Sequence, residues 1–211
     1  MTWTWEQIKD KRGQWPVHSV RPSVTEAERA ELCEWILATN GGARRVSVRG
    51  GEHSPFGTNE LVGKPAAANR LEQAAISVAR GCDRLYSPDF SPDHRWSIMT
   101  FHVVLEPGGW QEPHKHPGAR WAAVYYVSGN VESGGELFLE DGRGGVSRLI
   151  QPRLGVLRIM PASLLHGVRR YTGETPRIAW VANIYRDPPE RLGMWTEHRL
   201  FAGAPNTSVT I

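Results

Sequence analysis

The chain has 211 residues, of which 40% are apolar and 22% charged, and its formal net charge is +3. These values are ordinary for a globular protein with a substantial core. The small and scattered positive charge excludes the electrostatic pattern of a nucleic-acid-binding protein. The sequence contains no run of about 18 apolar residues, so it predicts no membrane span. The N-terminus lacks the basic start and apolar core of a signal peptide, so a cytoplasmic location is expected.

The first predicted helix follows an irregular N-terminal arm over residues 1–22. Thr25 and Glu28 have the spacing of a capping box. The apolar stripe that continues the helix consists of Ala30, Cys33, Ile36 and Leu37. The glycine pair at positions 41 and 42 ends it.

A short strand and a second helix come next. Residues 45–48 alternate as a strand does, and Gly50 and Gly51 close it. The second helix starts at Pro65, a favourable first-turn residue, and ends before Gly81. We expect both helices to brace the outside of a sheet.

From residue 96 onward the pattern is that of short strands. They are predicted over residues 97–105, 121–127, 136–140, 146–150, 156–160 and 178–185. Glycine-rich turns separate them, at residues 107–109, 133–135, 142–145 and 172–174. The predicted fold class is therefore mainly β, a jelly-roll or cupin-like barrel with supporting N-terminal helices. Residues 1–95 would form the arm and helices of one domain, 96–190 its barrel, and 191–211 a C-terminal extension.

Three histidines in this barrel region have the pattern of a metal site. His114 and His116 are separated by one residue, and on a strand both side chains would project to the same face. His166 follows a predicted strand and a turn that contains Pro161. Imidazole nitrogen suits Fe, Zn, Cu or Ni, and three protein ligands leave coordination positions open. The sequence therefore predicts a metal bound by His114, His116 and His166.

Several phrases between residues 96 and 185 together carry a family resemblance. They are His114-x-His116-Pro117, Ala123-Val-Tyr-Tyr-Val127, Gly134-Gly-Glu-Leu-Phe138 with Asp141, Pro152-x-x-Gly155, Pro161-x-x-x-x-His166, and Arg177-Ile178 leading to Asn183. This stretch resembles the double-stranded β-helix of the Fe(II)/2-oxoglutarate oxygenases, and it is most similar to a small bacterial subfamily of them.

The resemblance implies roles for four residues. His114 would be the first iron ligand and His166 the distal one. Arg177 lies where the superfamily places the basic residue that binds the far carboxylate of 2-oxoglutarate, and a guanidinium suits this task because it pairs with a carboxylate through two hydrogen bonds. Tyr126 would add a hydrogen bond from its hydroxyl group to 2-oxoglutarate. The implied cofactors are Fe(II) and 2-oxoglutarate, and the implied partners are O2 and a small-molecule substrate.

One departure from the superfamily concerns the usual His-x-Asp or His-x-Glu motif. Here His116 stands in the carboxylate's place, which raises the net charge of a metal centre by one unit. Three interpretations remain open. His116 is the third ligand, or a carboxylate such as Glu112 completes the site, or the protein binds metal without using 2-oxoglutarate.

The last interpretation rests on a second resemblance, to cupins. Gly108, five residues and then His114-x-His116 match the start of the first cupin motif, and the run from Gly155 to His166 resembles the second. Ser163 replaces a glycine of that motif, and Arg120 or Trp121 replaces the cupin glutamate. Cupin dioxygenases with three-histidine iron sites exist as a class.

Three hypotheses of function follow. The first is an Fe(II)- and 2-oxoglutarate-dependent dioxygenase that hydroxylates or desaturates a small organic substrate. The second is a three-histidine cupin-type dioxygenase or isomerase, and the third is a non-catalytic barrel used for binding. Candidate pocket residues, which would favour an aromatic or amphipathic substrate, are Trp96, Met99, His102, Trp110, Trp121 and Trp180. The sequence predicts no particular oligomeric state.

Overall fold

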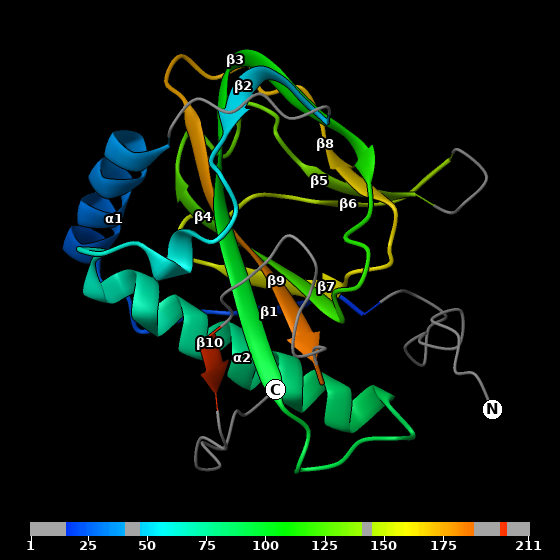
Figure 1. Cartoon of the computed structure of the whole chain (residues 1–211). Helices are drawn as coiled ribbons and strands as arrows, with labels where there is room; N and C mark the ends of the chain where they lie inside the picture. The colour runs from blue at the N-terminus through cyan, green and yellow to red at the C-terminus, as the bar shows by residue number, and fades with distance from the viewer. Residues whose placement is uncertain (1–15, 41–46, 141–144, 188–198, 202–211) are drawn as a thin grey trace.

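Two helices lie against a curled antiparallel sheet in this computed structural model, which describes residues 16–40, 47–140, 145–187 and 199–201 (Figure 1). The helices are α1 (Glu26–Thr39) and α2 (Ala66–Tyr86), and the 3₁₀ helix η2 (Thr58–Glu60) precedes α2. The strands are β1 (His18–Val20), β2 (Val48–His53), β3 (Trp96–His114), β4 (Trp121–Ser128), β5 (Leu137–Glu140), β6 (Val146–Ile150), β7 (Leu157–Pro161), β8 (His166–Val168), β9 (Arg177–Arg186) and β10 (Arg199–Phe201). Most of the predicted N-terminal arm and C-terminal extension, and most of the turn at 142–145, lie outside the described residues.

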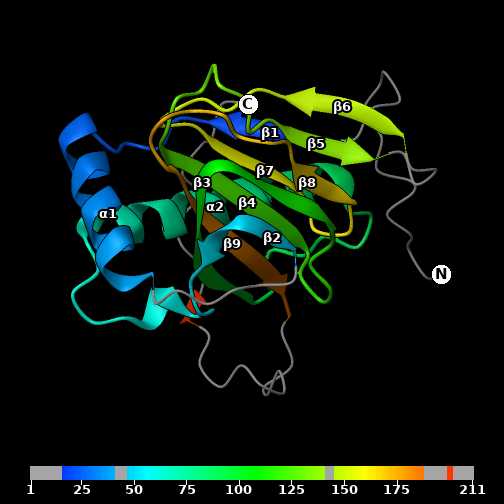
Figure 2. The same ribbon diagram turned by 90° about the horizontal axis from the view of Figure 1, so that it is seen from above.

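The long strand β3 connects the two halves of the sheet. The strand order is β1-β7-β4-β9-β3-β8-β5-β6, and β2 and β10 also pair with β3. The first part of β3 pairs with β9, from Trp96 opposite Arg186 to Leu105 opposite Arg177. Its last part pairs with β8 instead. The sheet therefore curls around an interior, with β5 and β6 on the side away from α1 (Figures 1 and 2).

The predicted turn at residues 107–109 is wrong, because this segment lies inside β3. Gly108 has φ +88°, and a Cβ on Gly109 would lie 2.3 Å from the carbonyl oxygen of Gly50. The two glycines let β3 bend from one half of the sheet to the other and let β2 approach closely.

The glycines of β2 have the same kind of role. The strand was expected over residues 45–48 with Gly50 and Gly51 as its end, but β2 begins at Val48 and continues through both glycines to His53. Gly50 has φ +61° where the register shifts, as in a β-bulge. A Cβ on Gly51 would lie 2.3 Å from the carbonyl oxygen of Val104. Residues 45 and 46 lie outside the described part.

Helix α1 begins as predicted. The Thr25 hydroxyl accepts a hydrogen bond from the Glu28 backbone N–H, and the Glu28 carboxylate accepts one from the Thr25 backbone N–H, which completes the capping box. The predicted apolar stripe is only half right. Ile36 is buried together with Leu32, whereas Leu37 is 54% exposed.

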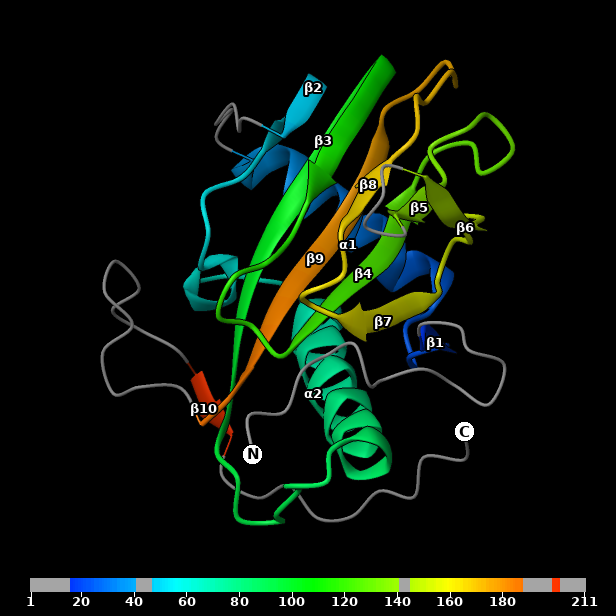
Figure 3. The same cartoon turned by 90° about the vertical axis from the view of Figure 1, so that its right-hand side faces the viewer.

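Helix α2 starts after Pro65, as expected, but it continues through Gly81 to Tyr86. The last turns are retained because Asp83 is fully buried and pairs with two arginines of the sheet, Arg120 and Arg186. These partners lie far away in the chain, so local helix propensity could not indicate them. Figure 3 shows α2 running alongside the lower part of the sheet.

The largest buried side chains lie between α2 and the sheet. Trp96, Trp121 and Trp180 are each at most 1% exposed and pack in one cluster with Leu71 and Ala75 of α2. Burial of such large aromatic groups is a major source of stability. Among the described residues, no helix has the length and apolar character needed to span a membrane.

A buried histidine in this fold predicts a loss of stability in mild acid. His102 is fully buried against Trp35, and burial lowers its pKa to about 3. The unfolded chain protonates this side chain below its ordinary pKa of about 6.5. The neutral form therefore stabilises the fold above pH 6.5, and this contribution is lost as the pH falls from 6.5 toward 3.

For the metal-free protein we expect His102 alone to lower the unfolding free energy with a slope that approaches about 1.4 kcal/mol per pH unit once the pH is well below 6.5. Urea denaturation at pH 7.0, 6.0 and 5.0 measures this slope. His102→Leu should flatten it by that amount. An unchanged slope in the variant would show that other groups cause the acid sensitivity.

Candidate metal centre

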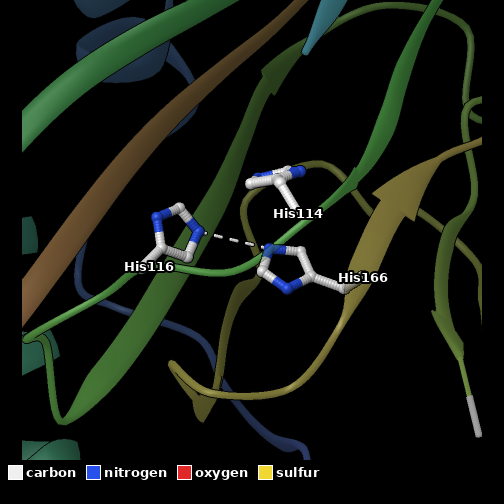
Figure 4. Close-up of side chains that lie close together, drawn as sticks. All are labelled: His114, His116 and His166. Atoms are coloured by element: carbon white, nitrogen blue, oxygen red, sulfur yellow. Dashed lines mark hydrogen bonds between the residues drawn. The ribbon is translucent and has the colours of Figure 1, made fainter. Parts of the chain in front are cut away.

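The structure brings the three predicted histidines together, with their rings facing one another (Figure 4). His114 is the last residue of β3 and His166 the first of β8, and the two are direct cross-strand partners. His116 lies beyond the end of β3, where its backbone N–H donates to the Ala162 carbonyl at 3.0 Å. The expected common strand for His114 and His116 is therefore wrong, although the expected proximity is confirmed. One ring nitrogen from each histidine lies within 4.8 Å of the others.

Two of the rings are held in a defined tautomer. The Nδ1 atom of His114 lies 2.8 Å from the Glu112 carbonyl oxygen, and Nδ1 of His166 lies 2.7 Å from the Leu164 carbonyl oxygen. Since a carbonyl can only accept, Nδ1 carries the proton in both rings. The lone pair of Nε2 is then free to bind a metal, and this is the usual arrangement of metal-ligating histidines.

Burial keeps the three rings neutral. It is the main cause that lowers the pKa of His114, that of His116 to about 3, and that of His166 well below its ordinary value. A neutral imidazole is the form that binds metals. Nε2 of His116 lies 3.2 Å from Nε2 of His166, so a cation at this point would replace the proton between the two nitrogens.

The carboxylate of Glu112 does not join this group. Its Oε1 pairs with Arg49 at 2.8 Å. In the part of the chain that the structure describes, no aspartate or glutamate belongs to the cluster of potential metal ligands around these histidines. The donor set is thus three imidazoles.

Arg177 and Tyr126 line the same cavity as the histidines. Arg177, the first residue of β9, is only 4% exposed, and its guanidinium carbon lies 5.1 Å from the centre of the Tyr126 ring. Burial lowers the pKa of Arg177 and raises that of Tyr126. Among the described residues, neither Arg177 Nε nor the Tyr126 hydroxyl has a partner with hydrogen-bond geometry, and no carboxylate pairs with Arg177. A buried cation without a counter-charge is costly, so this end of the cavity suits an anion.

Two glycines explain how the arginine is held. A Cβ on Gly129 would lie 3.0 Å from Cα of Arg177, and a Cβ on Gly135 would lie 2.9 Å from its Cδ. The Gly-Gly-Glu-Leu-Phe phrase therefore includes a residue that leaves room for the guanidinium stem.

Substitution of Gly135 tests this contact. Gly135→Ala should lower the unfolding free energy by about 1–3 kcal/mol more than Gly63→Ala, because both sites have φ between +70° and +80° but only Gly135 meets a neighbour. Chemical denaturation measures the difference, and the ¹⁵N resonance of Arg177 Nε should shift in Gly135→Ala only. Equal losses in the two variants would mean that Arg177 has free space around it.

The cavity walls differ from the expected set. None of Trp96, Met99, His102, Trp110, Trp121 and Trp180 lines the cavity. Side chains of β9 alternate, so Ala179 and Val181 face the interior and Trp180 faces α2. The aliphatic walls and one aromatic ring come from Phe101, Val103, Ala122, Ala123, Val124, Leu137, Met160, Val168, Ala179 and Val181.

One polar residue of the cavity was missed. Gln111 is 8% exposed, and its amide nitrogen lies 3.5 Å from Nε2 of His114. Its position three residues before His114 was the available signal. Simple alternation along a strand would place Gln111 and His114 on opposite faces. The register shift between them breaks this alternation, so both side chains face the cavity.

Comparisons with known proteins identify the fold. No family model and no curated protein sequence matches the chain. Solved structures do. A Pseudomonas putida prolyl-4-hydroxylase has a TM-score of 0.60 at 13% identity, over 81% of this chain and 92% of that one. HygX from Streptomyces hygroscopicus, with nickel and 2-oxoglutarate bound, has a TM-score of 0.55 at 14% identity, over 87% of each chain.

A third match is SnoK, a non-heme α-ketoglutarate-dependent carbocyclase from nogalamycin biosynthesis, with a TM-score of 0.60 at 13% identity over 88% of this chain and 84% of that one. The chain has the double-stranded β-helix fold of the 2OG-Fe(II) oxygenases. The predicted fold class is confirmed, and so is the resemblance at the level of the fold. At these identities the similarity extends to the fold alone.

Proposed function

We propose that the protein is an Fe(II)- and 2-oxoglutarate-dependent oxygenase that hydroxylates or desaturates a small organic substrate. The observation that carries this proposal is a buried Arg177, without a carboxylate partner among the described residues, in the same cavity as three convergent histidines. An enzyme that binds metal alone has no need of a buried cation there. The fold of the matching structures supports the same class.

The residues present fit both cofactors. Nε2 of His114 and His166, together with a ring nitrogen of His116, would hold Fe(II), and three protein ligands leave positions open. Arg177 would bind the far carboxylate of 2-oxoglutarate through two hydrogen bonds, and Tyr126 would donate a third. This anion supplies the counter-charge that the guanidinium lacks.

The chain's own contribution is binding, orientation and exclusion of water. When bound, iron and 2-oxoglutarate supply O2-dependent oxidative decarboxylation that oxidises a C–H bond of the substrate. Arg177 and Tyr126 set the direction of the cosubstrate, and the tight packing of Gly129 and Gly135 holds the arginine. Apolar side chains that line the cavity, such as those of Val103 and Val168, would keep water away from the bound metal.

A three-histidine set has a consequence for the metal. Replacing an anionic ligand by neutral His116 raises the net charge of the centre by one unit, which changes its redox potential and metal preference. We propose His116 itself as the third ligand, because Glu112 is engaged by Arg49.

The direct test is stoichiometric. Purified protein with Fe(II) should convert 2-oxoglutarate to succinate in air and not under anaerobic conditions, and the anaerobic complex should show a visible Fe(II)–2-oxoglutarate absorption band. If no band forms and calorimetry detects no binding of 2-oxoglutarate, the proposal fails.

A second candidate is favoured by the absence of a carboxylate among the described metal-site residues. This is the cupin-type dioxygenase or isomerase with three histidine ligands. Activity that requires metal but ignores 2-oxoglutarate would select it.

A further inference from the structure

A second cavity adjoins the metal site through His116. It has a volume of about 460 Å³, within the range of small-molecule sites. The loop that follows β3, with residues 115–120, forms most of its wall, and Ser163 and Arg186 complete it. His116 also lines the cavity of the three histidines. A molecule in this second cavity would therefore lie next to a residue of the metal site.

The charged side chains around the second cavity are all cations. Lys115, Arg120 and Arg186 line it, and no acidic side chain does so among the described residues. Lys115 is exposed and forms no ion pair with any described residue.

Buried and surface carboxylates hold the two arginines in place. Arg120 Nε donates to Oδ1 of Asp83 at 2.7 Å, and an Arg186 nitrogen donates to Oδ2 of the same carboxylate at 2.8 Å. Arg186 also pairs with Asp89 at 2.7 Å. In the described part of the chain, the two carboxylates that pair with these arginines leave the charge of Lys115 uncompensated. Because the guanidiniums are oriented before a ligand arrives, binding an anion costs little further ordering.

We propose that this cavity is the substrate site and takes a small organic carboxylate, held by Lys115, Arg120 and Arg186 beside His116. This inference rests on the proposed oxygenase function for its placement next to a metal. The remaining wall, formed by Pro117, Gly118 and Ala119, is apolar and suits a short hydrocarbon body attached to the carboxylate. The substrate is thus an amphipathic anion, distinct from the cosubstrate bound at Arg177.

The probes that test this are 4-fluorophenylacetate and its neutral amide, which have similar size and different charge. Their ¹⁹F line widths are recorded with metal-free protein, and then with protein loaded with Mn(II) and saturating 2-oxoglutarate. The acid should bind at least about tenfold more tightly than the amide, and Mn(II) should broaden its signal strongly because paramagnetic broadening falls steeply with distance.

Two variants localise the binding. Lys115→Glu reverses an exposed charge without touching the Asp83 network and should weaken binding of the acid by about tenfold. Arg84→Glu changes the net charge equally, lines neither cavity, and should leave binding unchanged.

Three results would overturn the proposal: equal binding of acid and amide, normal binding of the acid by Lys115→Glu, or binding of the acid without broadening by Mn(II). Failure of the oxygenase function has a separate signature, since Mn(II)-loaded protein would then show no 2-oxoglutarate binding in calorimetry. The preference for the acid over the amide is also measured in metal-free protein, so this part of the proposal is tested independently of the oxygenase function.

Discussion

Arg177→Met is expected to weaken 2-oxoglutarate binding by at least about 100-fold while metal binding stays normal, since removing one partner of a buried charge pair costs about 2–5 kcal/mol. The guanidinium has no described carboxylate partner, so under the proposed function 2-oxoglutarate would supply its counter-charge. Calorimetry with Mn(II)-loaded protein measures the affinity for 2-oxoglutarate, and metal analysis of the purified variant measures metal binding.

The stability of the same variant separates a binding role from a structural one. An unpaired buried charge destabilises a fold, and methionine of similar volume does not carry that cost. The cosubstrate-free Arg177→Met protein should therefore unfold at the same or a higher temperature than the unaltered protein. Tyr126→Phe is the milder companion and should weaken binding about two- to tenfold, the usual range for one hydrogen bond. A marked fall in melting temperature of Arg177→Met would instead make the arginine a structural element.

His166→Ala should abolish metal binding at micromolar metal, a loss larger than the roughly 10–100-fold typical of an outer-shell contact. The reason is that the Leu164 carbonyl already fixes the His166 ring with its Nε2 lone pair toward the site. The measurement is the rise in melting temperature on adding Fe(II), Mn(II) or Ni(II), together with metal content after gel filtration. His94→Ala is the matched control, because that ring contacts Asp187 and Asp89 outside the site.

His116→Asp tests the third position. It restores an anionic ligand where the superfamily usually has one, so it should bind Mn(II) and Fe(II) at least as tightly as the unaltered protein. A loss of metal comparable with that of His166→Ala would show that the backbone at 116 suits imidazole alone.

Local signals predicted the parts of the fold that depend on neighbours in the chain. The capping box of Thr25 and Glu28 is one example, since its hydrogen bonds close within three residues. The end of α2 is the contrary example, because Asp83 is retained in the helix by arginines more than thirty residues away. Glycines were the main source of error. At Gly51 and Gly109 they serve close backbone contacts inside strands, which sequence patterns do not distinguish from turns.

For the site, the histidine spacing was enough to predict the cluster, and the resemblance led to Arg177. What the sequence could not indicate is that Arg177 has no carboxylate partner among the described residues, since an ion pair depends on how the surrounding chain folds. The tryptophans were assigned to the wrong face, because a shift of one residue reverses every side chain of a strand. Gln111 was missed for a related reason.

The placement of the histidines divides the site into a rigid and an exchangeable half. His114 and His166 are cross-strand partners within the sheet, so strand pairing holds the backbone of both residues in place. His116 belongs to the loop beyond β3, where its backbone N–H donates to the Ala162 carbonyl and its own carbonyl accepts from the Ala119 backbone N–H. A substitution at this position would therefore change the third candidate ligand while the strand pairing that holds the other two histidines is kept. That makes the protein a convenient host for comparing imidazole, carboxylate and vacant third ligands in one otherwise constant pocket.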